Sequence, residues 1–554
     1  MYGAPPTPQT PASPAPSPTL VPVKLDAVTA PPNLPAGVSP RVINFDITKQ
    51  GISPRLGISL VGSSDVSSSH SLFNNDRGYV ISEWYASAAA GTYDSTVVAM
   101  SQRTIIWWDQ NSGFGWRASA FSSAISNTTP ANGAFDAAVV YNPVFDENVV
   151  VFGGAGNARA PYWEGPNAAS SQTFSTLTNS PLGATWLIPY DARLVFGIER
   201  QSGNTYLTNR VTWSARGDIY TYTEPSGGAE DLTDMRGGIT RLIDDGNRIL
   251  VFSEREIWEG VTYPFPFDFD FRPLDRTIGC TDGRTAQKTP LGVIFQGGDD
   301  RVYLLPKGSS KAQAIGGNVF PLLKQHENVS DGGGNATSPL DRKGAFAVYH
   351  SYRNAYELFP CTDTAAGVLT FPNVTARLNL DTLAWSVCSY RHAISAAGMI
   401  QQESIKRGAV CYVSTSSGTI GRMGEPFLRS LASGSTTDLG SAFSASALFP
   451  IGNPNPSQKL YVDSVLVDYS NFTCGSGSSI TIACSKDFGQ TYDLQVGVAL
   501  PQALYSQQTV VNLGYSAVYP SIEVRYESQK SGFDLCIQRI TAMVAGVGQP
   551  GLGG

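Results

Sequence analysis

Charged residues are scarce in this sequence, and so are cysteines. Asp, Glu, Lys and Arg make up 15% of the 554 residues, whereas soluble domains average about 25%. Helical bundles and coiled coils are rich in Glu, Lys, Leu and Ala, so this composition argues against them. The seven cysteines include no CxxC pair and no Cys/His cluster, and an odd number argues against a complete disulfide framework. Cys474 and Cys484 could meet across a hairpin, but reduced buried thiols are the more common state of such sparse cysteines.

An excess of basic residues is also lacking. The chain has 38 Lys and Arg against 45 Asp and Glu, a formal net charge of −7. Proteins that bind nucleic acid through its phosphates need a surplus of basic residues, so this charge argues against such a protein. A surface that nucleic acid passes without binding is still compatible with it. No apolar run approaches the roughly 18 residues that would span a bilayer, and residues 1–20 hold no basic residue and no apolar core. We expect no membrane-spanning segment, no secretory signal and folding in a reducing cytoplasm.

Glycine, proline and aromatic residues are abundant instead. The chain has 56 Gly, 36 Pro, 24 Tyr, 25 Phe and 9 Trp. So many aromatic side chains need cores to pack in, which argues against wholesale disorder. The composition predicts an all-β protein with many turns, and roughly 100–200 residues per domain predicts two to four domains.

Residues 1–41 differ from the rest of the chain. Twelve prolines fall between Pro5 and Pro40, interleaved with Ala, Thr and Ser. Such a stretch has too few apolar side chains to form a core, and its prolines favour extended polyproline II. We interpret it as an extended arm, which is either an unattached tail or a segment that lies along another subunit or partner.

Residues 42–440 carry a recurring pair of strands. In each pair a β-branched apolar run is followed by a short polar turn and a second strand that usually carries aromatics. Successive pairs begin roughly 44 to 64 residues apart, the length of one four-stranded propeller blade. We predict a β-propeller-like body of six or seven blades, with two β-sandwiches as the alternative. The first strands begin at Thr96, Val149, Arg193, Ile249, Val293, Ala345 and Ala409.

Past residue 440 the pattern changes to longer strands with period-two alternation. Gly- and Ser-rich turns separate them, which predicts a β-sandwich over residues 441–545. Residues 546–554 are too rich in glycine to be fixed by their own contacts. The strands are Leu460–Tyr469, Ile480–Cys484, Thr509–Leu513, Ile522–Tyr526 and Ile540–Val544.

Signals for catalysis are weak. The histidines at positions 70, 326, 350 and 392 stand at no metal-ligand spacing, and HExxH, GxSxG and phosphate-loop motifs are absent. Asp268 and Asp270 would point to one side of a strand, as a glycosidase acid pair does, although alternating Phe and Asp more often marks one buried and one wet face. We therefore expect no catalytic, cofactor-binding or metal-binding residue, no cofactor and no enzymatic activity.

One hairpin motif is more specific. Its residues Ser485, Asp487, Gly489, Thr491 and Tyr492 follow the S-x-D-x-G-x-T-[WY] pattern of the Asp-box. In this motif the Ser and Asp side chains cap turn amides, Gly takes a left-handed conformation and the aromatic ring packs beneath. Sialidases carry several copies, whereas this chain has a single copy outside the expected propeller, so its role is structural. Trp213 and Trp258, each at the end of a predicted strand, are expected to be packing residues.

The stretch from Tyr206 to Leu305 resembles the tail hub, or nozzle, proteins of short-tailed bacteriophages, also called packaged-DNA stabilisation proteins. The Asp-box-like hairpin in a C-terminal β region is similar to that family too, while residues 1–41 have no counterpart in it. The segments that carry the resemblance are Val211–Ser214, Gly217–Asp218, Leu232–Asp234, Gly238–Leu242, Arg248–Trp258, Arg276–Cys280 and Gly292–Tyr303.

The resemblance implies a structural role in a virion tail that is assembled in the host bacterial cytoplasm. Such proteins form a ring, usually of six subunits, below the portal and head–tail adaptor, and extend the channel through which double-stranded DNA leaves. Their partners are a tail fibre or spike and a distal plug or needle. Two alternatives remain: an extracellular propeller that binds or cleaves glycans, and a phage receptor-binding fibre or spike.

Overall fold

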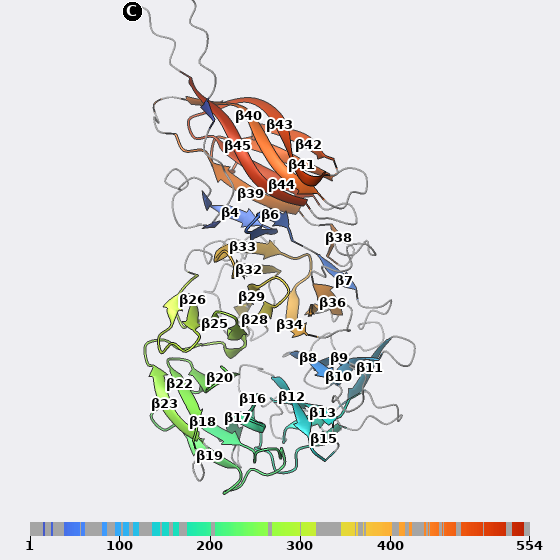
Figure 1. Cartoon of the computed structure of the whole chain (residues 1–554), viewed down its shortest axis with the longest axis vertical. Coiled ribbons are helices and arrows are strands. Elements are labelled where there is room, and N and C mark those ends of the chain that lie inside the picture. Colours follow the sequence, from blue (N-terminus) through green and yellow to red (C-terminus); the bar gives the residue numbers. More distant parts are fainter. Residues whose placement is uncertain are drawn as a thin grey trace, which may run out of the picture. The chain divides into compact units, whose positions relative to one another are not determined.

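The described residues form almost nothing but β-strands. Apart from one 3₁₀ turn, η3 (Gly283–Thr285), every regular element among them is a strand, which confirms the all-β prediction (Figure 1). None of their elements is a long apolar helix of the kind that crosses a membrane. The structure is a computed structural model that describes residues 15–16, 24–25, 38–55, 57–60, 80–85, 95–100, 104–109, 115–120, 136–144, 147–153, 159–165, 174–200, 205–263, 269–299, 301–316, 345–360, 362–363, 369–370, 373–401, 409–415, 420–423, 437–438, 441–442, 444–453, 457, 459–471, 478–501, 503–527 and 535–547.

The chain divides into two compact units. The propeller unit runs from Leu56 to Phe443, and the sandwich unit combines Met1–Arg55 with Ser444–Gly554. The propeller is therefore inserted into the sandwich sequence. Residues 42–55, which the sequence placed in the propeller body, belong to the sandwich unit instead.

Among the described residues, the strands of the propeller unit form seven groups of four, five of them as separate four-stranded antiparallel sheets and two within larger sheets, which gives seven blades. In six of them the four strands follow one another along the chain. These are β8 (Val80–Tyr85), β9 (Ser95–Met100), β10 (Thr104–Asp109) and β11 (Gly115–Ala120); β12 (Ala137–Asn142), β13 (Glu147–Phe152), β14 (Pro161–Trp163) and β15 (Phe174–Thr176); β16 (Trp186–Tyr190), β17 (Arg193–Arg200), β18 (Tyr206–Trp213) and β19 (Gly228–Asp231); β20 (Ile239–Asp244), β21 (Ile249–Ser253), β22 (Ile257–Thr262) and β23 (Phe269–Asp275); β24 (Gln287–Thr289), β25 (Gly292–Gln296), β26 (Val302–Pro306) and β27 (Gln313–Ala314); and β28 (Phe346–His350), β29 (Ala355–Phe359), β32 (Val374–Asn379) and β33 (Ala384–Ser389).

The seventh blade is completed from the other end of the unit. Its strands β34 (Ile394–Ile400), β35 (Val410–Thr415) and β36 (Ile420–Met423) are followed in space by β7 (Ile58–Leu60), which pairs antiparallel with β36. The short strand β37 (Thr437–Asp438) pairs with β7 and with β38 (Ser441–Ala442). Because the unit's first and last strands share one blade, its two chain ends lie side by side, which suits an inserted domain. The remaining ribbon joins β30 (Thr362–Asp363) and β31 (Leu369–Thr370).

The blades form a closed ring. Each blade's first strand contacts the first strand of the next blade, in the order β8, β12, β16, β20, β24, β28 and β34, and β34 contacts β8 again. In Figure 1 the sheets of this ring are seen arranged around a common centre. The second strands are buried on both faces between neighbouring blades, which explains their continuous apolar runs such as Ile249–Ser253.

The core is divided among the joints between blades. One cluster joins the third and fourth blades through Val195, Val211, Trp213, Val251 and Trp258. Comparable clusters join the first blade to the second and the seventh to the first. Further clusters join the second blade to the third, the fourth to the fifth and the sixth to the seventh, so the apolar core is spread around the ring.

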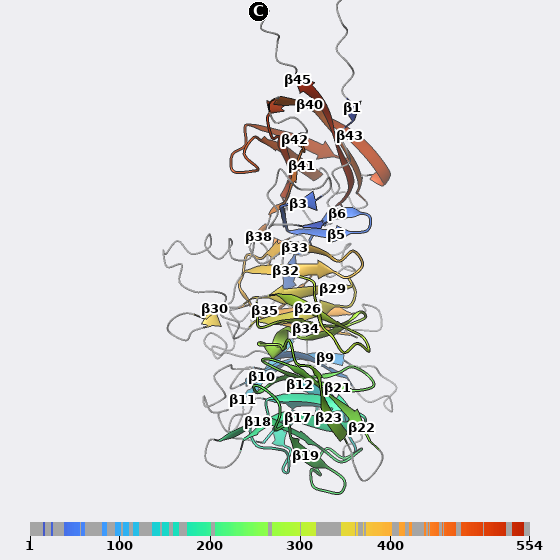
Figure 2. The same cartoon turned by 90° about the vertical axis from the view of Figure 1, so that its left-hand side faces the viewer.

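The sandwich unit contains two antiparallel sheets, one beside the other (Figure 2). Along β42 (Leu494–Leu500), half-buried Leu494, Val496 and Val498 alternate with exposed residues. The first sheet has the order β43 (Ala503–Ala517), β40 (Lys459–Asn471), β45 (Leu535–Val547), β6 (Gly51–Pro54) and β5 (Phe45–Thr48), with β1 (Ala15–Pro16) beside β45. The second has β4 (Arg41–Ile43), β39 (Ser444–Pro450), β44 (Ser521–Glu527), β41 (Ser478–Ser485) and β42 (Leu494–Leu500).

Strands β4, β5 and β6 explain why residues 42–55 leave the propeller. They pair with β39 and β45, so their apolar residues Val42, Phe45 and Ile52 are buried in the sandwich unit. Most of the predicted arm, residues 1–41, lies outside the described residues. Of the predicted tail 546–554, residues 546–547 belong to strand β45 and the rest lie outside the described residues. Within the arm, β2 (Lys24–Leu25) pairs in parallel with β3 (Val38–Ser39), and β1 pairs with β45.

Candidate functional site

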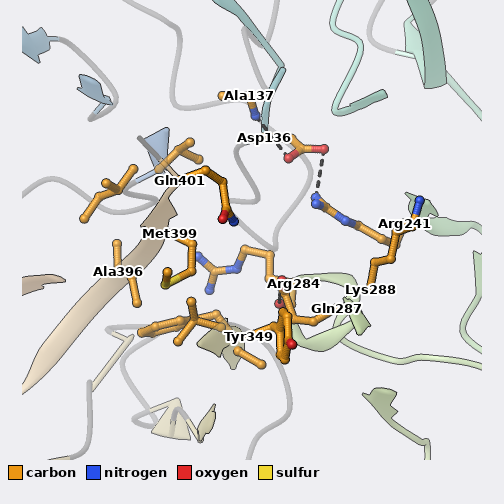
Figure 3. A pocket seen from close by; sticks show the side chains of 17 residues that line it. Asp136, Ala137, Arg241, Arg284, Gln287, Lys288, Tyr349, Ala396, Met399 and Gln401 are labelled. Atoms are coloured by element: carbon orange, nitrogen blue, oxygen red, sulfur yellow. Dashed lines mark hydrogen bonds and ion pairs between the residues drawn. The ribbon is translucent and has the colours of Figure 1, made fainter. Parts of the chain in front are cut away.

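A pocket of about 340 Å³ lies where the first strands of the propeller meet (Figure 3). Its walls come from β8, β20, β24, β28 and β34 and from Asp136, which immediately precedes β12. Residues far apart in the sequence therefore converge on the ring axis. The pocket is lined mainly by polar and charged groups, among them Asp136, Arg241, Arg284, Lys288 and Gln401.

Asp136 and Arg241 form one ion pair of the lining. Arg241 Nη1 lies 2.8 Å from Asp136 Oδ2, and the backbone N–H groups of Ala137 and Leu187 donate to the same carboxylate at 3.0 and 3.2 Å. The guanidinium also stacks over the Trp186 ring, 5.2 Å from its centroid. Burial raises the pKa of Asp136, and Arg241 and the two N–H groups oppose that rise. These contacts fix Arg241 in one orientation at the pocket wall.

Arg284 is positioned by the turn η3. The Asp282 carboxylate caps this turn by accepting from the Arg284 backbone N–H at 3.3 Å. Gly283 approaches Thr240 so closely that a Cβ would lie 1.6 Å from the Thr240 carbonyl oxygen, and only glycine fits there. The Arg284 side chain is 10% exposed, its guanidinium lies over the Phe346 ring and its Nε stands 4.0 Å from Asp282 Oδ1. Its far end extends into the pocket (Figure 3).

The remaining polar residues lie along the rim and floor. Gln287 Nε2 donates to the Arg284 carbonyl at 3.2 Å, and the Gln401 N–H donates to Glu83 at 2.7 Å. Lys288, half exposed, has its Nζ 3.7 Å from Asp244 Oδ2. Three cations and one carboxylate line the pocket, a formal excess of two positive charges (3 − 1). The described lining contains no Ser, Thr or Cys nucleophile beside a His base. No cluster of three metal-ligating groups occurs among the described residues.

A second group of ionisable residues is buried in the sixth blade. Glu357 accepts from His350 Nε2 at 2.8 Å, Arg377 Nη2 at 2.9 Å and Tyr390 Oη at 2.7 Å, and Thr375 also donates to it. Burial alone would raise the pKa of Glu357, but Arg377, His350 and Thr375 together hold it well below its usual range. Burial lowers the pKa of His350. The lining of the axial pocket does not include this network, and we assign the network to the packing of the blade.

The Asp-box-like hairpin joins β41 to β42. Ser485 Oγ accepts from the Gly489 N–H at 2.8 Å, and Asp487 Oδ1 accepts from the Thr491 N–H at 2.8 Å. Hydrogen bonds from Thr491 and Ser485 lower the pKa of Asp487 to about 2. The Tyr492 ring lies under the Arg525 guanidinium, 4.0 Å away, and its Oη accepts from Arg41 at 2.6 Å. The Ser485, Asp487 and Thr491 side chains thus bond within the hairpin, whereas Tyr492 contacts Arg41 and Arg525 outside it.

We expect Gly489→Ala to destabilise the sandwich unit by about 1–2 kcal/mol, because Gly489 has φ +87° and alanine is strained there. A Cβ would also lie 2.9 Å from Tyr492 Oη. The matched control is Gly497→Ala on β42, which meets nothing within 4 Å and should be neutral or slightly stabilising. Far-UV circular dichroism during urea unfolding measures both. Equal behaviour of the two variants would contradict the left-handed requirement.

The structure places the other residues singled out in the sequence as follows. Trp213 and Trp258 share the core cluster between the third and fourth blades. Asp270 is exposed between buried Phe269 and Phe271, the pattern of a strand with one wet face, while Asp268 lies outside the described residues. Cys484 is a buried free thiol, and its suggested partner Cys474 also lies outside them. His70 and His326 are not among the described residues either.

The axial pocket was not anticipated from the sequence. Arg241 and Arg284 lie 43 positions apart, and Asp136 and Gln401 lie further still, so only ring closure brings them together. A sequence signal existed at Arg241, which interrupts the apolar residues of Gly238–Leu242. A lone cation within an inner strand indicates a position that faces something other than a core.

Comparisons with known proteins identify no relative by sequence. No family model matches the chain, and no curated protein matches it. Among solved structures, BBS1N in complex with ARL6DN matches with a TM-score of 0.39 and 10% identity, over 67% of this chain and 98% of that one. A tryptophan-to-alanine mutant of Synechocystis apocarotenoid oxygenase matches with a TM-score of 0.32 and 7% identity, over 83% and 97%. Both likenesses are too low to support an inference, so the propeller assignment rests on the strand pairing of the chain itself.

Proposed function

We propose that this chain is a structural, non-enzymatic component of a short bacteriophage tail: the nozzle or hub ring below portal and adaptor. In this role it forms a homohexameric ring, extends the DNA channel, helps to retain the packaged genome and lets it pass during ejection. Its neighbours are the head–tail adaptor, a tail fibre or spike, and a distal plug or needle. The observation that carries the proposal is the resemblance of the stretch from Tyr206 to Leu305 to the nozzle proteins of short-tailed bacteriophages.

The fold of that stretch supports a scaffolding role. It runs from β18 to β26, and several of its charged residues pair with one another. Glu259 binds Arg248 and Arg272, both at 2.8 Å, and Glu256 accepts from the Arg236 N–H at 2.7 Å and from Trp258 Nε1 at 2.9 Å. Arg248, Glu256 and Trp258, which belong to the resembling segments, thus connect neighbouring strands. We expect such contacts in a structural ring protein.

The charge of the chain supports the same role. Duplex DNA carries one negative charge per roughly 1.7 Å, so a strongly basic bore would grip it and stall ejection. A net charge of −7 suits a wall that DNA passes without specific binding.

Four measurements test the proposal. Negative-stain imaging of the purified chain should show six-fold rings with a central hole, and particles that lack the protein should package DNA but lose it. The isolated chain should bind no duplex measurably at physiological salt. Salt-sensitive submicromolar binding, full DNA retention without the protein, or hydrolysis of glycans by the purified chain would overturn the proposal, the last in favour of a glycan-cleaving propeller.

A further inference from the structure

We infer that the axial pocket of the propeller binds a small oxyanion, a molecule that presents a phosphate or carboxylate group to Arg284, Arg241 and Lys288. The inference concerns the propeller unit alone and does not depend on the role of the chain in a phage tail. It follows from the charge, the construction and the size of the pocket.

The charge of the lining favours an anion. The charged lining residues are three cations, Arg241, Arg284 and Lys288, and one carboxylate, Asp136. Asp244, Asp282 and Glu83 contact lining residues but do not themselves line the pocket. The lining itself therefore presents more cationic than anionic side chains to an anion.

The two arginines are held in place before any ligand arrives. Trp186 and Asp136 fix Arg241, while Phe346 and the η3 turn fix Arg284. A guanidinium offers parallel N–H donors that match the two oxygens of a carboxylate or phosphate. Because the side chains are already ordered, binding costs little further conformational entropy. Packing of a blade does not by itself require two ordered guanidinium groups at a pocket.

The size of the pocket limits the ligand to a small molecule. A volume of about 340 Å³ lies at the lower end of the roughly 300–1,000 Å³ typical of small-molecule sites. Apolar groups of Phe346, Ala396 and Met399 line the rest of the pocket, so a short carbon skeleton would find contacts there. The site fits a small phosphorylated or carboxylated molecule.

Isothermal titration of the full chain with inorganic phosphate and with succinate tests the inference, with sodium chloride at matched ionic strength as reference. We expect saturable one-site binding of at least one of the two anions. Phosphate binding alone indicates a phosphorylated ligand, and succinate binding alone indicates a carboxylate. Arg284→Gln should weaken that binding about tenfold or more, since it removes a charge-assisted donor. Arg301→Gln, an exposed arginine in the same blade, is the matched control and should leave binding unchanged.

A second variant keeps the test decisive if Arg284→Gln fails to fold. Lys288 is 52% exposed, so Lys288→Glu should fold normally and weaken binding about tenfold by reversing a charge at the rim. Lys307→Glu, exposed on the same blade, is its control. Absence of saturable binding to the wild-type chain, or equal binding by Lys288→Glu and its control, would overturn the inference.

Discussion

Glu357→Gln is expected to destabilise the propeller unit by about 3–5 kcal/mol, because removing one partner of a buried ion pair leaves the other charge uncompensated. Glu357 and Arg377 are almost fully buried, with side-chain exposures of 0% and 3%. The substitution also replaces one acceptor oxygen of Glu357 by a donor NH₂ group that faces the donors of His350 and Arg377. The effect should appear as a lower urea midpoint of propeller unfolding.

Tryptophan fluorescence isolates this transition. All nine tryptophans lie between Trp84 and Trp385, within the propeller unit. The matched control is Glu254→Gln, an exposed glutamate in the β21–β22 turn, which should change stability by no more than about 0.5 kcal/mol. A loss below about 1 kcal/mol for Glu357→Gln would show that the network contributes little to the blade.

The pH dependence of stability should carry the signature of the same network. The depressed pKa of Glu357 adds stability that is present above the unfolded pKa, about 4.3, and is lost as the pH falls through the folded value. The lowered pKa of His350 acts in the same direction, because below about pH 6.5 the unfolded chain takes up a proton that the folded chain does not. Wild-type stability should therefore fall on acidification, and the gap to Glu357→Gln should shrink below about pH 4.3.

Trp213→Ala and Trp258→Ala should each cost about 3–5 kcal/mol, the range for truncating a buried aromatic side chain. Trp213 is 7% exposed and packs edge-on against Phe269, with ring centroids 5.0 Å apart. Trp258 is 5% exposed and donates its Nε1–H to Glu256 at 2.9 Å.

Conservative variants separate packing from hydrogen bonding at these two positions. Trp258→Phe keeps most of the ring but removes the donor to Glu256, and Trp213→Phe keeps a ring beside Phe269, so each should cost less than its alanine variant. Far-UV circular dichroism during urea unfolding measures all four variants. A change under about 1 kcal/mol for either alanine variant would mean that the residue belongs to a binding surface and not to the core.

The sequence predicted the strands that lie between blades better than those at blade edges. Runs such as Ile249–Phe252 are apolar on both faces, so their pattern survives in the sequence. Edge strands such as β27 (Gln313–Ala314) are short and exposed, and nothing in their residues distinguishes them from loops. The pairing of β36 with β7 could not be predicted, because the two strands lie far apart in the sequence and no local pattern identifies them as partners.

The candidate site was beyond sequence reasoning for a related reason. The hairpin at Ser485–Tyr492 could be predicted because the hydrogen bonds that shape its turn are local. The pocket at Arg284 depends on which residues face the axis, and that is decided by closure of the ring from blades separated by more than a hundred residues. Residues 42–55 show the same limit, since their partners β39 and β45 lie some four hundred residues away.

The position of β7 has a consequence for how the chain is made. β7 ends at Leu60 and its partner β36 begins at Ile420, so 360 residues (420 − 60) must be translated after β7 before β36 appears. At roughly 5–20 residues per second, the ribosome needs about 20 to 70 seconds for that stretch. During this time Ile58, fully buried in the finished blade, has no β36 to pair with. The last blade therefore sets the earliest moment at which a nascent propeller can close, and a chaperone has that interval in which to bind the unpaired strand.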